Sequence, residues 1–319
     1  MSEITQAFVL GAGLGTRLRP LTDDLPKPLV PVFQKPLITF AFDHLIDIGI
    51  ANFFANTHHR PERFVEAFPA AIYRDRRIQF VHEPELLETA GGIANIAGAL
   101  PDEPLLVYNA DILTDLPIAR LIDRHFHSGN IVTLALRSGQ EPKHIAFDAG
   151  SGRILDIQNA LGSGLPHELL FTGIYIIERR FIDRLERGVK RSVVPYFLEL
   201  IRAGEKIGGV VIDEGNWWDV GNRASYLQLH RDLLRLKFPA YRVGDPNWKT
   251  TVHESATVDA SAELRGCSVV GRNCEVGAGA ILDDTILWAG AQIASKSHLL
   301  GCIVRTHRRV EGIHQGIDI

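Results

Sequence analysis

Short, continuously apolar runs alternate with amphipathic stretches along the first 236 residues of the chain. The run at residues 7–10 has no polar alternation, which is typical of a parallel strand buried on both faces. Similar runs predict strands at 50–55, 78–81, 105–108, 131–136, 144–147, 153–157, 171–177, 207–212 and 217–220, the last two completing the sheet. Apolar residues at helical spacing predict helices near 37–48, 61–68, 89–98, 180–186, 193–203 and 224–236. This alternation predicts an α/β fold with a Rossmann-like mixed, mostly parallel sheet and helices on both faces.

A second pattern, with a period of six, begins after a polar stretch at 238–250. Its apolar positions are Val252, Val258, Leu264, Val270, Val276 and Leu282, and after a slip of one residue Ile293 and Leu299. Six residues fit one face of a triangular coil, so the pattern predicts a short parallel β-helix of about three turns. The predicted organisation is therefore a domain at 1–237, a linker at 238–250, a hexapeptide-repeat β-helix at 251–304 and a solvated or subunit-contacting tail at 305–319.

Composition narrows the class of protein. The 319 residues carry a net charge of −4, so we expect no general affinity for nucleic acid or for an anionic membrane, and any anion binding must be local. No apolar run is long enough for a membrane span, and the three cysteines include no Cys-x-x-Cys pair. These features predict a cytoplasmic protein with buried free thiols.

The most informative stretch follows the first predicted strand. Three closely spaced glycines precede a guanidinium at Arg17 and an ammonium at Lys27, which stands between two prolines. Glycine backbone amides, a planar fork and a fixed point charge together suit a polyphosphate. The predicted cradle consists of Leu10, Gly11, Ala12, Gly13, Gly15, Thr16, Arg17 and Lys27. A dinucleotide fingerprint is disfavoured because the third glycine comes one residue early, and no P-loop motif occurs.

The segment from Gly11 to Pro28 resembles the signature of the sugar-phosphate nucleotidylyltransferases, also called nucleotide-sugar pyrophosphorylases. Further matches lie at 83–92, 107–111, 171–175 and 217–221, and the C-terminal repeats are similar to the left-handed hexapeptide-repeat domain. The resemblance implies Mg²⁺-dependent transfer of a nucleotidyl group from an NTP to a sugar 1-phosphate, with release of pyrophosphate. A catalytically silent sugar-nucleotide-binding regulatory subunit is the alternative.

The resemblance also implies roles for individual residues. Arg17 would neutralise the departing pyrophosphate and Lys27 the α-phosphate, while Asp111 and Asp219 would hold the metal. From the residues alone, Asp111 could instead cap a helix and Asp219 could be an acid in a turn. The implied catalytic residues are Arg17, Lys27 and Asp111.

Two further segments match the family. The segment 83–92 resembles its base-recognition segment, which implies contacts to the nucleotide from Glu83, Thr89, Ala90 and Gly91. The strand at 171–175 resembles the sugar-contacting strand, which together with the end of the 105–108 strand implies contacts to the sugar from Asn109, Thr172 and Gly173. We expect the His58-His59 pair to lie on a loop surface.

One departure from the family concerns the cation that binds the phosphate of the sugar. Many relatives carry Glu-Lys-Pro before the sugar strand, but the corresponding stretch around Gln158 has no lysine. Lys143, Lys190 or Arg191 could replace it, or the metal could neutralise more of the phosphate charge. Two substrate pairs stay open, one resembling UTP with N-acetylmuramate 1-phosphate and the other GTP with mannose 1-phosphate.

The β-helix is expected to pack against a neighbouring subunit or against its own catalytic domain rather than to carry out chemistry. The β-helix could join subunits into a homo-oligomer. Removal of the β-helix should alter the oligomeric state more than turnover. Acyl transfer at the β-helix would need His298, and about three turns make that role improbable.

Overall fold

The computed structural model describes residues 4–319, which form two compact units. The first unit consists of the residues up to Leu14 together with Phe40–Trp218 and Pro239–Arg242. The second consists of Gly15–Thr39, Asp219–Phe238 and Val243–Ile319.

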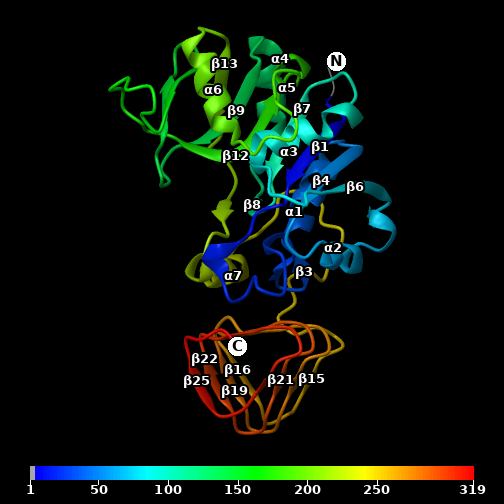
Figure 1. Ribbon diagram of the computed structural model, residues 1–319. Helices are drawn as coiled ribbons and strands as arrows, with labels where there is room; N and C mark the ends of the chain where they lie inside the picture. Colours follow the sequence, from blue (N-terminus) through cyan, green and yellow to red (C-terminus); the bar gives the residue numbers. More distant parts are fainter. Residues whose placement is uncertain (1–3) are drawn as a thin grey trace. The chain divides into compact units, whose positions relative to one another are not determined.

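A ten-stranded mixed sheet forms the centre of the first unit (Figure 1). Its strands, in spatial order, are β10 (Ile145–Asp148), β11 (Arg153–Ile157), β13 (Ile207–Val211), β9 (Val132–Arg137), β12 (Leu170–Ile177), β7 (Leu105–Asn109), β1 (Gln6–Leu10), β4 (Asn52–Thr57), β6 (Arg76–His82) and β5 (Ile72–Tyr73). Only β12, β11 and β5 run against the direction of β1. The predicted mixed, mostly parallel sheet is confirmed.

Helices cover both faces of this sheet. Tyr175 of β12 packs against Phe197 of α6 (Val193–Arg202), with ring centroids 5.7 Å apart, and it pairs with Leu134 of β9. The neighbouring Thr133 faces the other way, because side chains alternate along a strand, and it contacts His125 of α4 (Ile118–Ser128). Helix α3 (Glu88–Ile96) packs into the same hydrophobic core as α6, and α1 (Ile38–Asp47) lies on the same face of the sheet as α4. The shorter α2 (Pro61–Ala67) and α5 (Arg179–Ile182) complete the helices of this unit.

One predicted strand lies outside the large sheet. Residues Trp217–Asp219 (β14) pair with Ile112–Thr114 (β8) in a separate two-stranded sheet, so the prediction that 217–220 complete the main sheet is wrong. Asp115 explains this course, because its carboxylate accepts a hydrogen bond of 2.6 Å from the Asn216 amide just before β14. The chain is thereby held at the end of β8 instead of continuing along the sheet.

The second unit contains a coil of stacked parallel strands (Figure 1). Three ladders form its sides: β15 (Thr257–Val258), β18 (Glu275–Val276), β21 (Gln292–Ile293) and β24 (Arg309–Val310); β16 (Glu263–Arg265), β19 (Ile281–Asp283), β22 (His298–Leu300) and β25 (Ile313–Gln315); and β17 (Val269–Val270), β20 (Ile286–Leu287) and β23 (Ile303–Val304). The buried interior contains the six-period positions Val276, Leu282, Ile293 and Leu299, which confirms the β-helix-like arrangement.

The coil is longer than expected. Strands β24 and β25 belong to the stretch predicted as a tail, yet they pair with β21 and β22 and continue the ladders. The charged residues Arg305, Arg308 and Arg309 suggested a solvated tail, but Val310, which directly follows Arg309, fills the interior. Apolar side chains are needed only on the inward position of each short strand, so a mostly polar segment can still add a turn.

Outside the coil, the second unit contains the segment from Gly15 to Thr39, the residues Asp219–Phe238 with α7 (Arg223–Arg235), and the chain that leads from Val243 to the coil. The segment contains two short helical turns, η1 (Thr16–Leu18) and η2 (Lys27–Leu29), and the strands β2 (Pro31–Val32) and β3 (Lys35–Pro36). Helix α7 begins with a capping box between Asn222 and Ser225. Across residues 4–319, no helix combines the length and apolar character needed to cross a membrane.

Candidate active site

The cationic loop in the second unit depends on the left-handed backbone of Gly15. Its φ of +61° directs the chain into η1, and a Cβ there would lie 3.0 Å from Cγ2 of Thr22 and 3.2 Å from Cβ of Lys27. The hydroxyl of Thr22 donates a 2.8 Å hydrogen bond to the Gly15 carbonyl. Only glycine fits this position, and the fit brings the start of the loop against Lys27.

Lys27 is held rigidly within this loop. The residue is only 7% exposed and begins η2, with Pro26 before it and Pro28 after it. Its Nζ lies 3.8 Å from Oδ1 of Asp219, whose side chain is 42% exposed. The pair therefore joins a buried ammonium to a carboxylate at the surface.

Arg17 reaches the same place over Gly221. A Cβ on Gly221 would lie 3.0 Å from Oδ2 of Asp219 and 3.3 Å from Nη1 of Arg17, so both groups lie beside this glycine. The second unit thus brings together Arg17, Lys27 and Asp219, three of the residues predicted from the sequence. A guanidinium, an ammonium and a carboxylate in such proximity suit binding of a phosphate group and its metal.

In the first unit, a buried asparagine that the sequence analysis did not single out links two predicted segments. Oδ1 of Asn56 accepts hydrogen bonds from the amides of Gly11 (2.7 Å) and Ala12 (3.3 Å). Nδ2 of Asn56 donates to Oε1 of Glu83 (2.8 Å), and Oε2 of Glu83 accepts from the amide of Leu87 (3.0 Å). The available signal was that Asn56 ends the second strand where a dinucleotide-binding protein would carry an acid.

The start of α3 is packed against another segment of its own unit. The amides of Ala90 and Gly91 donate to the Arg191 carbonyl at 3.0 and 3.3 Å, and the Thr89 hydroxyl accepts from the Val193 amide at 2.7 Å. A Cβ on Gly91 would lie 2.4 Å from the carbonyl oxygen of Val189. The small residues at this helix start therefore serve internal packing, while contacts to a base from Glu83, Thr89, Ala90 and Gly91 stay a prediction.

The predicted sugar strand shows a similar close fit. Gly173 has a φ of +81°, and a Cβ there would lie 2.7 Å from Nδ2 of Asn109 and 2.5 Å from Cδ1 of Ile112. The buried Thr172 hydroxyl donates to the Ala135 carbonyl at 2.9 Å. The missing side chain at Gly173 thus makes room for Asn109, which brings together two of the three residues predicted to contact the sugar.

Asp111 follows β7 in the first unit. The amide of Ala110 donates a 3.0 Å hydrogen bond to the Leu10 carbonyl, so the ends of β7 and β1 meet directly before Asp111. The Asp111 side chain is half-buried. Asp219 belongs to the second unit, and a metal shared by these two carboxylates stays a prediction.

The donor set nevertheless fits the predicted ion. Both residues offer hard carboxylate oxygens that are not fully buried, which is the ligand type Mg²⁺ prefers alongside waters and phosphates. Within residues 4–319, no group of three or more His, Cys, Asp or Glu side chains forms a site that could hold a metal by itself.

The stretch that lacks the lysine of the relatives is organised by Asp156. Its buried carboxylate accepts hydrogen bonds from the amides of Ile157 (2.7 Å), Leu161 (3.1 Å) and Ser163 (3.2 Å). Burial favours a raised pKa, but the hydrogen bonds from Ser163, Leu161 and Ile157 outweigh it and hold the pKa of Asp156 below its usual value. The loop is thus stabilised around an anion, and residues 154–160 contain no lysine.

The three candidate cations differ in their surroundings. Lys143 and Lys190 are exposed. The guanidinium of Arg191 lies 2.5 Å from Oε1 of Glu199 and 4.2 Å from the ring centroid of Tyr196. Arg191, which precedes α6, is therefore held by two side chains of that helix, whereas Lys143 and Lys190 are exposed.

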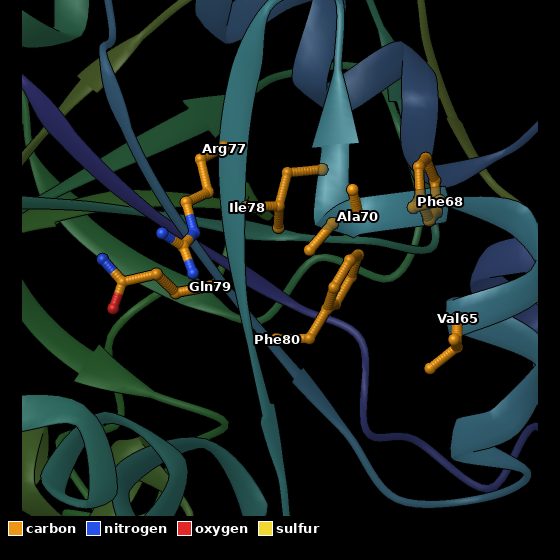
Figure 2. Close-up of a pocket in the computed structure, with 8 residues that line it drawn as sticks. Val65, Phe68, Ala70, Arg77, Ile78, Gln79 and Phe80 are labelled. Carbon is orange, nitrogen blue, oxygen red and sulfur yellow. The ribbon is translucent and has the colours of Figure 1, made fainter.

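A separate hollow of about 700 Å³ lies at the edge of the first unit, between the end of α2, the turn η3 (Pro69–Ala71) and β6. Ile78 and Phe80 point toward Ala70, while Arg77 and Gln79 point to the other side of the strand (Figure 2). Its lining contains none of the predicted site residues. The chemistry described above does not involve this hollow.

Comparisons with known proteins bear on the family of this chain. A model of the family described as "Nucleotidyl transferase" matches residues 6–235. The chain is 32% identical to mannose-1-phosphate guanylyltransferase of Mycobacterium tuberculosis, over 93% of this chain and 82% of that protein. It is 28% identical to a probable mannose-1-phosphate guanylyltransferase 3 of rice (96% and 87% covered) and 25% identical to the UTP–glucose-1-phosphate uridylyltransferase of Synechocystis (98% and 90% covered).

Proposed function

This chain belongs to the nucleotidyl transferase family and is a sugar-1-phosphate nucleotidyltransferase, and from that premise we propose its substrates, its metal and its site. We propose that it transfers the nucleotidyl group of GTP to mannose 1-phosphate, with Mg²⁺ as the cofactor. UTP with a sugar 1-phosphate is the second pair to test. The names of the relatives support this order, since two of the three described above are guanylyltransferases.

The observation that carries the proposed site is the convergence of Arg17, Lys27 and Asp219 beside Gly221. In the reaction, an oxygen of the sugar phosphate forms a bond to the α-phosphorus while the bond from that phosphorus to the pyrophosphate oxygen breaks. Lys27 would stabilise charge on the α-phosphate and Arg17 would stabilise the departing pyrophosphate. A sugar phosphate is already ionised near pH 7, so this chemistry needs no general base from the protein.

The metal would be held by Asp111 and Asp219. When bound, Mg²⁺ supplies positive charge that screens the two phosphate groups from each other. Lys27, which lies 3.8 Å from Asp219, would keep that carboxylate oriented toward the phosphates.

The nucleotide and the sugar would be bound by the first unit. We propose that the loop from Leu10 to Gly13 follows the triphosphate and that the Glu83 segment contacts the base. Asn109 and Thr172 would contact the sugar. The hydrogen bonds that Asn56 accepts from the Gly11 amide and donates to Glu83 support this arrangement because they hold the loop and the Glu83 segment in one place.

A substrate panel tests the proposal. Pyrophosphate release is measured for GTP, UTP, ATP and dTTP, each with mannose 1-phosphate, glucose 1-phosphate and N-acetylmuramate 1-phosphate, with and without Mg²⁺. Lys27→Met should lower kcat/KM by about 100-fold or more, as is typical for loss of a charge that stabilises the transition state. Lys237→Met, an exposed lysine of the same unit, is the matched control and should have no effect. Full activity of the Lys27 variant would refute the proposed site.

Two further proposals concern setting and assembly. We propose that the enzyme acts in the cytoplasm, where nucleoside triphosphates are abundant. We also propose that any homo-oligomer forms through the coil, where Ile313 exposes 81% of its surface. Light scattering of Ile313→Glu beside the unchanged protein tests this, because an unchanged mass for an oligomeric protein would exclude that face.

A further inference from the structure

The cationic loop and the C-terminal coil belong to the same compact unit. Arg17 and Lys27 lie on the segment from Gly15 to Thr39, which precedes the coil by more than 200 residues in the sequence. The contacts between them fall at two places, one on each side of Lys27.

The first place is the turn that follows Arg17. Nη1 of Arg305 donates to the Pro20 carbonyl at 3.1 Å and to Oδ2 of Asp24 at 3.3 Å, and Nη2 of Arg308 lies 3.7 Å from the same carboxylate. The Arg305 side chain is only 16% exposed, and Arg305 directly follows β23 of the coil. Such charge-assisted bonds from a rigid element are stronger than those from a mobile surface side chain.

The Pro20 carbonyl is the group that closes this turn. It also accepts a 3.1 Å hydrogen bond from the Asp23 amide, while the Leu21 amide donates to the Leu18 carbonyl at 2.9 Å. Arg305 therefore contacts the same oxygen that determines the course of the chain after η1. Any loosening of this turn would act on Arg17, which lies within η1.

The second place lies beyond Lys27. The amide of Gln34 donates to the Trp248 carbonyl at 2.9 Å, and Nε2 of Gln34 donates to the Val270 carbonyl at 3.2 Å. The indole of Trp288 donates to the Tyr226 hydroxyl (3.1 Å), which in turn donates to the Pro31 carbonyl (2.5 Å). The segment between Pro20 and Gln34, with Lys27 in its middle, is thus held at both ends by contacts that lead to the coil.

We propose that Arg305 is a positioning residue for the nucleotidyl transfer reaction: it fixes the turn at Pro20–Asp24 and thereby holds the Arg17 guanidinium where the pyrophosphate is bound. This inference rests on the proposed role of Arg17. It also reverses the expectation from the sequence that loss of the coil would change assembly more than chemistry, since the coil supports the loop that carries the catalytic cations.

The full-length protein tests this with three variants. Arg305→Met removes both hydrogen bonds but keeps the aliphatic stem, Arg305→Lys keeps the charge, and Arg309→Met removes an exposed arginine of the same coil as the matched control. Amide exchange is followed by mass spectrometry in peptides that cover residues 15–31. We expect Arg305→Met to speed exchange there about five- to tenfold, Arg305→Lys to restore part of the protection, and Arg309→Met to match the unchanged protein.

Binding of inorganic pyrophosphate with Mg²⁺, measured by calorimetry, gives the second readout. Arg305→Met should weaken this binding about tenfold. It should also raise KM for the NTP, while the melting temperature stays close to that of the unchanged protein. Exchange and pyrophosphate affinity equal to those of Arg309→Met would overturn the proposal, and so would a faster exchange without any loss of pyrophosphate affinity. Lack of turnover by the unchanged protein with every substrate pair would instead count against the proposed substrates, because neither of these two readouts depends on turnover.

Discussion

The most direct test of the site is the substitution Gly221→Ala. The new methyl group would lie 3.0 Å from Oδ2 of Asp219 and 3.3 Å from Nη1 of Arg17. Unstrained contacts to a carbon lie at about 3.5 Å, so the two groups must retreat by roughly 0.5 and 0.2 Å. Both are ends of flexible side chains, and Gly221 is not among the glycines with positive φ, so the backbone accepts alanine.

The displacement should affect catalysis more than folding. Active-site groups must be held within about 0.5 Å of their productive positions, and a misplacement of about 1 Å costs roughly 100-fold in rate. We therefore expect kcat/KM to fall about 10- to 100-fold, which corresponds to about 1.4–2.7 kcal/mol of transition-state stabilisation. Alanine lowers the entropy of the unfolded chain by about 0.4–1 kcal/mol, which offsets the crowding, so the free energy of unfolding should change by less than about 1 kcal/mol.

The assay compares pyrophosphate release with urea unfolding for the same variants. Gly98→Ala is the matched control: it adds a methyl group at an exposed glycine whose nearest non-local atom is 3.6 Å away, in ordinary contact. That variant should keep full activity. Unchanged kcat/KM in a folded Gly221→Ala protein would refute the reasoning, because Arg17 and Asp219 could then be displaced without consequence.

Three other predictions concern the first unit and the pH dependence. Asp111→Asn should abolish turnover while the far-UV circular dichroism and melting temperature stay close to those of the unchanged protein; near-normal activity would remove Asp111 from the metal site. Gly91→Ala should destabilise the protein by about 2 kcal/mol or more, since its Cβ would lie 2.4 Å from the carbonyl oxygen of Val189, and an unchanged urea midpoint would contradict this packing. Burial lowers the pKa of His44 to about 3 and that of His230 to about 4, so the unfolded chain binds more protons below about pH 6.5. The contribution of these histidines to the free energy of unfolding should therefore be fully present well above pH 6.5, and the free energy of unfolding should fall by about 2 kcal/mol per histidine at pH 5. Equal stability at pH 7.5 and pH 5 in urea titrations would exclude this contribution.

The contacts of His230 explain why protonation of its buried ring lowers the stability of the folded protein. Its Nδ1 donates to the Tyr226 carbonyl at 2.9 Å, and its Nε2 accepts from the Phe33 amide at 3.2 Å. Both ring nitrogens are thus satisfied in the neutral form, and a second proton would break the bond to Phe33. His230→Gln should reduce the slope of stability against pH.

Local features of the sequence were sufficient for much of the fold. Continuous apolar runs predict the strands of the large sheet because both of its faces are covered by helices, and the period of six predicts the coil because one residue in six must point inward. The motif around Arg17 and Lys27 predicts a phosphate loop because its glycines permit positive φ and its basic residues cluster positive charge. The additional turn of the coil was missed because its outward residues are charged.

The sequence by itself therefore determined the elements, the family resemblance and the residue types of the site. Only the tertiary structure decided which of them meet: Lys27 with Asp219, Asn56 with Glu83, and Arg305 with Pro20, a pair separated by 285 positions. It also decided that Gly91 and Gly173 make room for neighbouring protein atoms. The reason is physical, because periodicity reports which face of an element is buried, whereas the partner across that face depends on how distant segments pack together.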